Sequence, residues 1–410
     1  MTTNIRIRLC TMMFLEFFIW GGWFVTMGSY LAANLHATGA QTAMAYSTQS
    51  WGAIIAPFIV GLIADRYFNA ERILGVIHIG GAALMYVLFS SRRFEAFYPC
   101  LLAYMILYMP TLALVNAISF RQMDDPSQHF SGIRVWGTVG WIVAGLLISY
   151  FFAWDASAAM AQGLLRNTFL MCCIASFGLG IYSFTLPSTP PVPQSDQRTQ
   201  LGRLLGLDAL ILLKHRNFLV FFVSSIFICI PLAFYYQNAN QFLTEIQVAN
   251  ATGKQTIGQM SEVLFMLLIP VFLTRFGMKT TLLLGMLAWA CRYLLFAFGN
   301  AHALGFMLIL GIALHGVCYD FFFVSGQIYT DSKAGAEHKS AAQGLITLAT
   351  YGVGMLIGFW VAGRIDDLYF SGGVHDWKAI WVYPAGFAAA VFVLFAATFR
   401  NETVDYAKSP

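Results

Sequence analysis

Twelve long apolar stretches, separated by short polar segments, constrain this chain more than any other feature. They cover residues 9–33, 42–64, 72–91, 97–120, 132–153, 165–186, 217–243, 256–275, 279–298, 302–326, 339–363 and 378–399. Each is close to the roughly 20 residues that a tilted helix needs to cross the hydrocarbon core of a bilayer. The pattern therefore predicts an all-α membrane protein with twelve transmembrane helices.

Composition supports this class. Hydrophobic residues make up 59% of the chain and charged residues 10%, and the mean hydropathy is +0.68, as in proteins that cross the membrane repeatedly. The first apolar stretch contains Glu16 and is too long for the core of a signal peptide, so we expect it to be retained. None of the seven cysteines forms a C-x-x-C pair, so the sequence suggests neither a disulfide framework nor a metal site.

The basic residues of the loops predict the orientation of the chain. With the N-terminus inside, fifteen Lys and Arg residues fall on the inner side of the membrane and six on the outer side. Cytoplasmic loops of membrane proteins carry such an excess of Lys and Arg. We therefore expect both termini to be cytoplasmic.

The longest loop, residues 187–216, divides the apolar stretches into two groups of six. It begins with a proline-rich segment that cannot be helical and ends in residues 201–213, an amphipathic stretch that could lie along the inner membrane surface. We expect a six-helix half at 1–186, a cytoplasmic linker at 187–216 and a second six-helix half at 217–410. Two such halves are typical of a transporter with a pseudo-twofold axis.

Residues 133–141 place polar and aromatic groups at the start of the fifth stretch. Arg134, Thr138 and Trp141 are spaced i, i+4 and i+7 and share a helix face, while Gly137 and Gly140 permit close helix packing. A cation, a hydroxyl and an aromatic ring on one face could bind a flat polar ligand. Alternatively, Arg134 extends to the lipid headgroups or forms a structural ion pair, because an arginine costs roughly 2.5–3.5 kcal/mol at a helix centre on insertion scales.

Three acids lie within apolar stretches, where ionisable groups are rare and are functional candidates. Glu262 follows Gln259 by three residues and shares its face, Asp320 lies among aromatic residues, and Glu16 lies near Trp and Gly residues. Each could carry a proton, since a carboxyl is cheaper to enclose in an apolar site when protonated. Each could instead be a structural group paired with a neighbouring helix. His78 could relay protons or be a polar residue satisfied between helices.

Two short loops resemble the gating loops of the major facilitator superfamily. Residues 61–66 read Gly-Leu-Ile-Ala-Asp-Arg, like the superfamily's G-x-x-x-D-R loop, and residues 275–279 resemble its counterpart in the second half. Phe68 stands where a glycine is usual. The resemblance implies that Asp65 and Arg66 brace two helices across a cytoplasmic gate and do not bind substrate.

Five further segments narrow the resemblance to the nucleoside:proton symporter family of that superfamily. They are residues 108–112, 133–138, 205–209, 259–262 and 319–322, in the family's order along the chain. The resemblance implies the major facilitator fold and import of nucleosides by proton symport through alternating access. It also implies a monomer in a bacterial inner membrane, with no cofactor and no nucleic-acid partner.

The same resemblance implies the site residues. Those expected to bind substrate are Arg134, Thr138, Trp141, Tyr236, Asn240, Gln259, Glu262, Tyr319 and Asp320. Arg134 and Asp320 are expected to anchor or gate, and Gln259 and Glu262 to hydrogen-bond the ribose or base. Proton coupling is expected of Glu262 and Asp320, and also of Glu16, which is a candidate only because it is a third acid within an apolar stretch.

The chain departs from the family in its seventh stretch. Ala233 and Tyr236 lack the amide that the family carries there, while Gln237 and Asn238 are additional polar residues. His315 replaces a tyrosine, and the rings of Trp141 and Tyr319 stand where better-known members have phenylalanine. These changes leave open another polar aromatic or glycosidic solute.

Other functional classes fit less well. The sequence contains no H-E-x-x-H, G-x-S-x-G, P-loop or dinucleotide-binding motif, so we do not expect an enzyme or an ATP-driven pump. A channel or a non-transporting receptor is compatible with the apolar stretches alone. The two halves and the buried ionisable groups favour alternating access instead.

Overall fold

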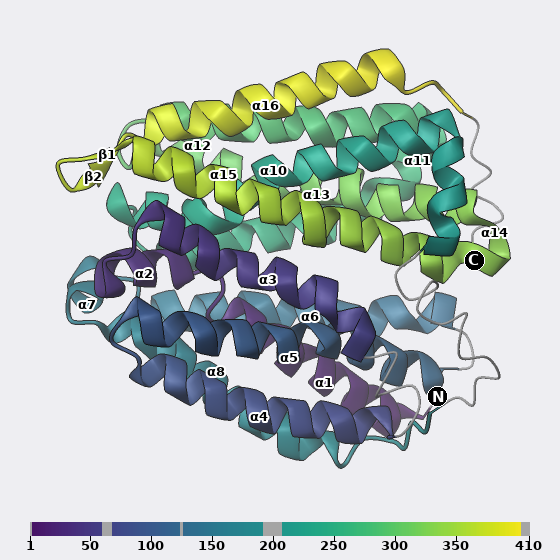
Figure 1. Ribbon diagram of the computed structural model, residues 1–410, viewed down its shortest axis with the longest axis horizontal. Coiled ribbons are helices and arrows are strands. Elements are labelled where there is room, and N and C mark those ends of the chain that lie inside the picture. Colours follow the sequence, from purple (N-terminus) through teal and green to yellow (C-terminus); the bar gives the residue numbers. More distant parts are fainter. Residues whose placement is uncertain (1, 60–67, 124–125, 192–206, 403–410) are drawn as a thin grey trace. The chain divides into compact units, whose positions relative to one another are not determined.

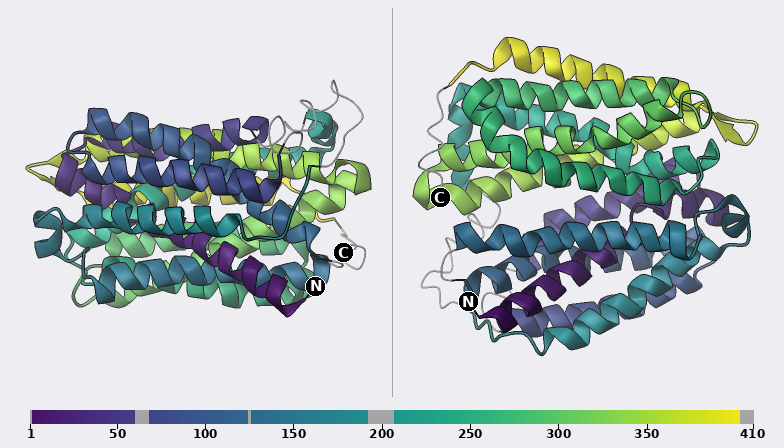
Figure 2. Two further views of the ribbon diagram at one scale, coloured as in Figure 1. Left: turned by 90° about the horizontal axis from the view of Figure 1, so that it is seen from below. Right: turned by 180° about the vertical axis from the view of Figure 1, so that it is seen from behind.

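The computed structural model of the chain describes residues 2–59, 68–123, 126–191 and 207–402 and is mostly helical there (Figure 1). It divides into two compact units. The first comprises Met1–Gln200 together with Ala249–Thr256, and the second comprises Leu201–Val248 together with Ile257–Pro410. Within each unit the long helices run side by side (Figure 2).

The first unit contains the helices up to residue 183. Their bounds are α1 Thr3–Gly21, α2 Met27–Leu35, α3 Gly39–Ile59, α4 Ala70–Ser90, α5 Phe94–Arg121, α6 Pro126–Leu146, the π-helical η2 Leu147–Phe151, α7 Ser157–Ala161, the 3-10 turn η3 Leu164–Arg166 and α8 Asn167–Ser183. Helix α1 packs against α6, α4 packs against α8 and α5, and α3 packs against α5.

The second unit contains the remaining elements. They are the 3-10 helix η4 Leu207–Lys214, α10 Arg216–Glu245, α11 Ala251–Phe298 (its first residues belong to the first unit), α12 Gly305–Ala313, α13 His315–Tyr319, the π-helical η5 Asp320–Val324, α14 Ser325–Thr347, the π-helical η6 Leu348–Gly354, α15 Met355–Leu368, β1 Phe370–Ser371, β2 Val374–His375 and α16 Trp377–Thr398. Helix α10 packs against α15 and α16, and the two strands form an antiparallel hairpin.

Nine helical segments of the described residues are long and apolar enough to cross a membrane. One of them is α11, which contains the two stretches expected at 256–275 and 279–298 and bends at Gly277, where φ is 78°. That positive φ is the left-handed conformation that favours glycine. A membrane protein of long helices is therefore confirmed, while the number of twelve spans stays a prediction.

The first expected span differs from the prediction, because it is interrupted between α1 and α2. Residues 22–26 form turns, and Trp23 and Phe24 there are buried. Trp23 packs edge-on against Tyr104, with ring centroids 5.7 Å apart. A Cβ at Gly22 would lie 2.7 Å from Cys172 Sγ, so the turn needs glycine for its close approach to α8. Burial of these large rings accompanies the break in the helix.

Some predicted features lie outside the described residues. These are Asp65 and Arg66 of the gating loop and residues 201–206 of the amphipathic stretch. Residues 207–213 of that stretch belong to η4, which packs against α14 and α10. The division at 1–186, 187–216 and 217–410 remains a proposal beside the two units described above.

Candidate functional site

Arg134, Thr138 and Trp141 all lie on α6 in the first unit and are half-buried. The Arg134 guanidinium carbon lies 4.1 Å from the centre of the Phe17 ring on α1. A cation over an aromatic face is attracted by the negative face of the ring. Helix α1 therefore holds Arg134 through an aromatic ring.

Close packing of α1 and α6 makes this contact possible. A Cβ at Gly140 would lie 2.1 Å from the Phe14 carbonyl oxygen, and one at Gly137 would lie 2.7 Å from Phe17 Cδ2. Such separations are too short for a side chain, so both positions require glycine. The close approach predicted from these two glycines is confirmed. Trp141 packs edge-on against Trp20 of α1, with ring centroids 5.6 Å apart.

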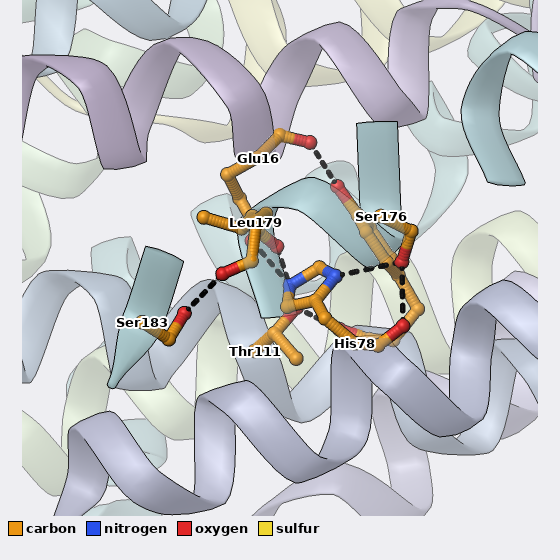
Figure 3. A network of polar contacts seen from close by, with 7 residues as sticks. Glu16, His78, Thr111, Ser176, Leu179 and Ser183 are labelled. Atoms are coloured by element: carbon orange, nitrogen blue, oxygen red, sulfur yellow. Dashed lines mark hydrogen bonds and ion pairs between the residues drawn. The ribbon is translucent and has the colours of Figure 1, made fainter. Parts of the chain in front are cut away.

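Glu16 is completely buried in the first unit and forms a network with three other helices (Figure 3). Its Oε2 lies 2.8 Å from His78 Nε2 on α4, and its Oε1 accepts a hydrogen bond of 2.5 Å from Thr111 on α5. His78 Nδ1 lies 3.1 Å from the hydroxyl of Ser176 on α8. Glu16 and His78 therefore contact each other. The roles left open for them, a structural pair or a carrier of protons, concern one joint site.

Glu262 and His315 form a second glutamate–histidine pair, in the second unit. Glu262 Oε1 lies 2.8 Å from His315 Nε2, and the side chains are 18% and 1% exposed respectively. The other ring nitrogen, Nδ1, lies 2.8 Å from Nη1 of Arg292. A guanidinium has only N–H donors, so Nδ1 must accept and the ring proton is on Nε2. His315 is therefore a neutral donor to Glu262.

Arg292 is the main site residue that sequence reasoning missed. It is fully buried, and its guanidinium carbon lies 3.5 Å from the centre of the Tyr235 ring on α10. Tyr235 also stacks on His315, with ring centroids 5.1 Å apart. An arginine within an apolar stretch was a visible signal. Its partner His315 is 23 residues away along the chain, so the pairing required the fold.

The approach of α13 to α11 places His315 beside Glu262. A Cβ at Gly316 would lie 2.5 Å from the Ser261 carbonyl carbon, and the Gly316 amide donates to Ser261 Oγ at 2.9 Å. Gly316 therefore allows the two backbones to meet directly.

Asp320 and Tyr319 lie where the helix changes from α to π geometry. Asp320 begins η5 and is fully buried. The Tyr319 hydroxyl lies 2.7 Å from that of Tyr351, within the π-helical η6. Single π turns occur often at functional sites.

The remaining predicted residues lie on α10 and α11. Tyr236 and Gln259 are half-buried, and Asn240 is buried. Gln259 precedes Glu262 by one helical turn on α11, as the spacing predicts. These positions agree with the expected elements, while the binding roles of the residues stay predictions.

Gln237 and Asn238, the additional polar residues of the seventh stretch, hydrogen-bond a buried acid on another helix. Their amides donate to the two carboxyl oxygens of Asp366 on α15, at 2.9 and 2.7 Å. All three side chains are buried. These additional polar residues therefore satisfy a buried acid that the sequence analysis did not single out.

No group of three or more His, Cys, Asp or Glu side chains within the described ranges could hold a metal ion.

The family model described as "Nucleoside H+ symporter" matches residues 1–404. The chain is 42% identical to the "Putative nucleoside transporter YegT" of Escherichia coli (strain K12), over 96% of this chain and 93% of that protein. It is 35% identical to the "Xanthosine permease" of the same organism, over 97% and 96%. A crystal structure of a variant of the nucleoside transporter NupG superposes with a TM-score of 0.88 at 29% identity, over 97% of this chain and 100% of that chain.

The match extends over nearly the whole length of the chain, and the matched residues include both glutamate–histidine pairs. The expected resemblance is therefore confirmed. The chain belongs to the nucleoside H+ symporter family, whose named relatives here are transporters and permeases.

Proposed function

We propose that this chain imports nucleosides together with protons across a bacterial inner membrane by alternating access. The observation that carries the proposal is the Glu262–His315–Arg292 network. It presents a partly exposed carboxylate, supported by a neutral histidine donor and backed by a fully buried cation. Such a carboxylate can accept a proton or a hydrogen bond from a ligand hydroxyl.

In the second unit, Gln259 and Glu262 would hydrogen-bond the ribose or base of the substrate. The rings of Tyr236 and Tyr319, with Asn240, would complete the contacts from this unit. A nucleoside offers both a flat π face and several hydroxyl groups. Aromatic rings and polar side chains are the groups that recognise such a ligand.

In the first unit, Arg134, Thr138 and Trp141 would contact the substrate. Arg134 is held over Phe17, and Trp141 is supported by Trp20. Two aromatic residues of α1 thus fix the cation and the ring that α6 carries. Groups fixed in this way lose little conformational entropy when a ligand binds.

The proton would be carried by Glu262 or Asp320. A proton on Glu262 removes a negative charge and so lowers the desolvation cost of closing the protein around its substrate. Asp320 is fully buried, and burial favours a neutral carboxyl over an ionised one. Both acids therefore belong in the test of coupling.

The proposal includes a monomer with both termini in the cytoplasm, no nucleic-acid partner, no cofactor and no enzymatic activity. Asp65 and Arg66 would act at the cytoplasmic gate.

The test is uptake of labelled uridine, adenosine and xanthosine into proteoliposomes of the purified chain, with and without an inward proton gradient. We expect saturable uptake that rises with the gradient and falls when a protonophore collapses it. Empty liposomes are the control.

Uptake that ignores the gradient would contradict symport. If folded protein transports none of the three, the substrate belongs to another class, and a panel of polar aromatic and glycosidic solutes comes next. Saturable binding without net flux would instead indicate a receptor.

A further inference from the structure

The Glu16–His78 pair differs from a simple buried ion pair, because its hydrogen-bond partners determine where the protons are. The Ser176 hydroxyl donates its single proton to the His78 carbonyl oxygen at 2.9 Å. Its oxygen can therefore only accept in the 3.1 Å contact with His78 Nδ1. Nδ1 of His78 accordingly carries a proton.

The contact of the other ring nitrogen, Nε2, with Glu16 requires a second proton. With a proton on Nδ1, a neutral His78 would direct the lone pair of Nε2 at Glu16 Oε2, 2.8 Å away. A bare nitrogen and an ionised carboxylate repel each other at that distance. The bond therefore contains one further proton, either on Nε2 as an imidazolium or on Oε2 as a carboxylic acid.

Thr111 is placed to follow a change in that proton. Its hydroxyl oxygen lies 2.5 Å from Glu16 Oε1 and 2.6 Å from the Tyr108 carbonyl oxygen. One hydroxyl proton serves two acceptors, so it can turn from the carboxyl to the carbonyl when the charge on Glu16 changes. The Tyr108 hydroxyl donates at 2.7 Å to the Glu16 carbonyl oxygen and ties α5 to α1.

The network is also connected to Trp141, the aromatic residue on the predicted substrate-binding face of α6. Tyr108 packs edge-on against Trp20, with centroids 5.9 Å apart, and Trp20 packs against Trp141 at 5.6 Å. A movement of Glu16 on α1 would therefore reach Trp141 through two packed rings.

We propose that Glu16 and His78 form a proton-binding site within the first unit, and that release of this proton during transport separates α1 from α4. The link to transport rests on the proposed function, whereas the proton itself does not. As long as Ser176 donates to the His78 carbonyl oxygen, loss of the proton leaves a bare Nε2 facing a carboxylate, and the 2.8 Å contact opens. The site thus acts as a proton-dependent lock between two helices.

Among the described residues, the other titratable side chains near the pair are Tyr104 and Tyr108 on α5 and Cys172 on α8. The nearest charged group that the packed helices contribute there is Arg134 on α6, which lies over Phe17, the neighbour of Glu16 in the sequence.

The proton is tested by spectroscopy on the full chain in lipid, without substrate. ¹⁵N NMR of histidine-labelled protein reports the protonation of each ring nitrogen, and infrared difference spectra between wild type and Glu16→Gln report a protonated carboxyl. We expect a protonated Nδ1 on His78. If the shared proton is on the imidazole, we also expect a protonated Nε2 that becomes bare in Glu16→Gln, because the Gln amide can donate to it. If the shared proton is on Glu16, we expect a carboxylic acid band that is lost in Glu16→Gln. A bare Nδ1, or neither of the last two signals, would overturn the proposal.

Glu71→Gln is the matched control. Glu71 is also a buried glutamate of the first unit, but it accepts from the Asn69 amide and the Thr189 backbone N–H, so it needs no shared proton. This variant should leave both His78 signals and the acid band unchanged. Glu16→Asp, which keeps an acid on a shorter side chain, replaces Glu16→Gln if the latter does not fold. It should shift the acid band or weaken the Nε2 signal.

The link to transport is tested in proteoliposomes. Glu16→Gln should reduce gradient-driven accumulation about fivefold or more, the lower range of measured couplings between binding sites, and leave exchange of preloaded substrate intact. Full accumulation in a variant that has lost the spectroscopic signals would overturn the link and leave a structural proton. If the wild type carries no nucleoside, the spectroscopic result still decides whether the proton is present.

Discussion

Two glutamate–histidine pairs, one in each unit, share a separation of 2.8 Å but differ in what lies behind the histidine. In the first unit a serine hydroxyl accepts from His78 Nδ1. In the second unit the Arg292 guanidinium donates to His315 Nδ1. The same contact therefore holds a shared proton in one unit and a neutral donor facing a carboxylate in the other.

Exposure separates the pairs as well. Glu16 is completely buried, whereas the Glu262 side chain is 18% exposed. The exposed part of Glu262 is available for the proposed contact with substrate, whereas the first pair is closed to a ligand and would respond to protons and to movement of its helices. The distance between a carboxylate and an imidazole therefore does not define the role of such a pair. The role depends on the group that contacts the second ring nitrogen of the histidine, which is Ser176 in the first unit and Arg292 in the second.

The largest loss of transport is expected when the acid of the partly exposed pair, Glu262, can no longer be ionised. Glu262→Gln keeps a hydrogen-bonding side chain but cannot be ionised, so gradient-driven accumulation should be abolished while exchange of preloaded substrate persists. Asp320→Asn is the parallel variant. Uptake into proteoliposomes, with and without the gradient, measures both. Full accumulation in both variants would show that neither acid carries the proton.

Arg292→Met removes the group that distinguishes the second pair from the first. Breaking a buried charged network costs about 3–5 kcal/mol, so thermal unfolding should occur at a clearly lower temperature and KM for substrate should rise. Arg93→Met, at an exposed arginine, is the control and should change little. Unchanged stability and KM would mean that Arg292 does not set the His315 tautomer.

Gly316→Ala tests whether the position of His315 beside Glu262 depends on close backbone contact. The added Cβ would meet the Ser261 carbonyl carbon at 2.5 Å, and such overpacking costs about 1–3 kcal/mol. Thermal unfolding and KM should both worsen. Gly386→Ala, whose added Cβ would meet no other part of the described chain within 4 Å, provides a control that should behave as wild type.

Ser176→Ala weakens the first pair without touching either charge. It leaves the Nδ1–H of His78 without an acceptor, a loss of about 1–2 kcal/mol for a buried donor. Ser183→Ala is the matched control, because this buried serine on the same helix donates only to the Leu179 carbonyl oxygen at 2.7 Å (Figure 3). Equal unfolding temperatures in the two variants would contradict the assigned proton on Nδ1.

The smallest effect on stability is expected at the ion pair between Lys333 on α14 and Glu402, which follows α16, because solvent screens the two charges. Lys333 Nζ lies 2.6 Å from Glu402 Oε2, and both side chains are about one-third exposed. Burial raises the pKa of the Glu402 carboxyl, but the hydrogen bond and charge of Lys333 outweigh burial and leave that pKa below its usual value.

The sign of the pH effect follows from that shift. The pair stabilises the fold above the ordinary pKa of glutamate and loses this contribution as pH falls through the lowered pKa. Lys333→Met should cost about 0.2–1 kcal/mol at neutral pH. Thermal unfolding of wild type and variant should converge in acid. A difference that persists in acid would assign the effect to packing.

Sequence reasoning predicted the class and most of the elements, because membrane-spanning helices need long apolar runs. It also identified Glu16, Glu262 and Asp320, since ionisable residues are rare in such runs. The break at residues 22–26 was not predicted, because the aromatic residues that are buried there look as apolar as those of a continuous helix.

The partners of the acids could not be predicted for a different reason. Glu16 and His78 are 62 residues apart, and Arg292 and His315 are 23 apart. Helical periodicity relates residues within one helix and says nothing about which helices pack together. Arg292 was visible as a lone cation, and its role appeared only when α11 and α13 were brought together.

The buried Arg292 has a consequence for how the protein is made. Residue 292 leaves the ribosome before residue 315, so the second half of α11 reaches the bilayer ahead of the helix that carries its histidine partner. An unpaired arginine near the centre of a span costs the insertion machinery roughly 2.5–3.5 kcal/mol. The rings of Trp289 and Phe296 of the same helix lie within 6 Å of the guanidinium carbon, and their attraction for a cation offsets part of that cost before the next helix arrives.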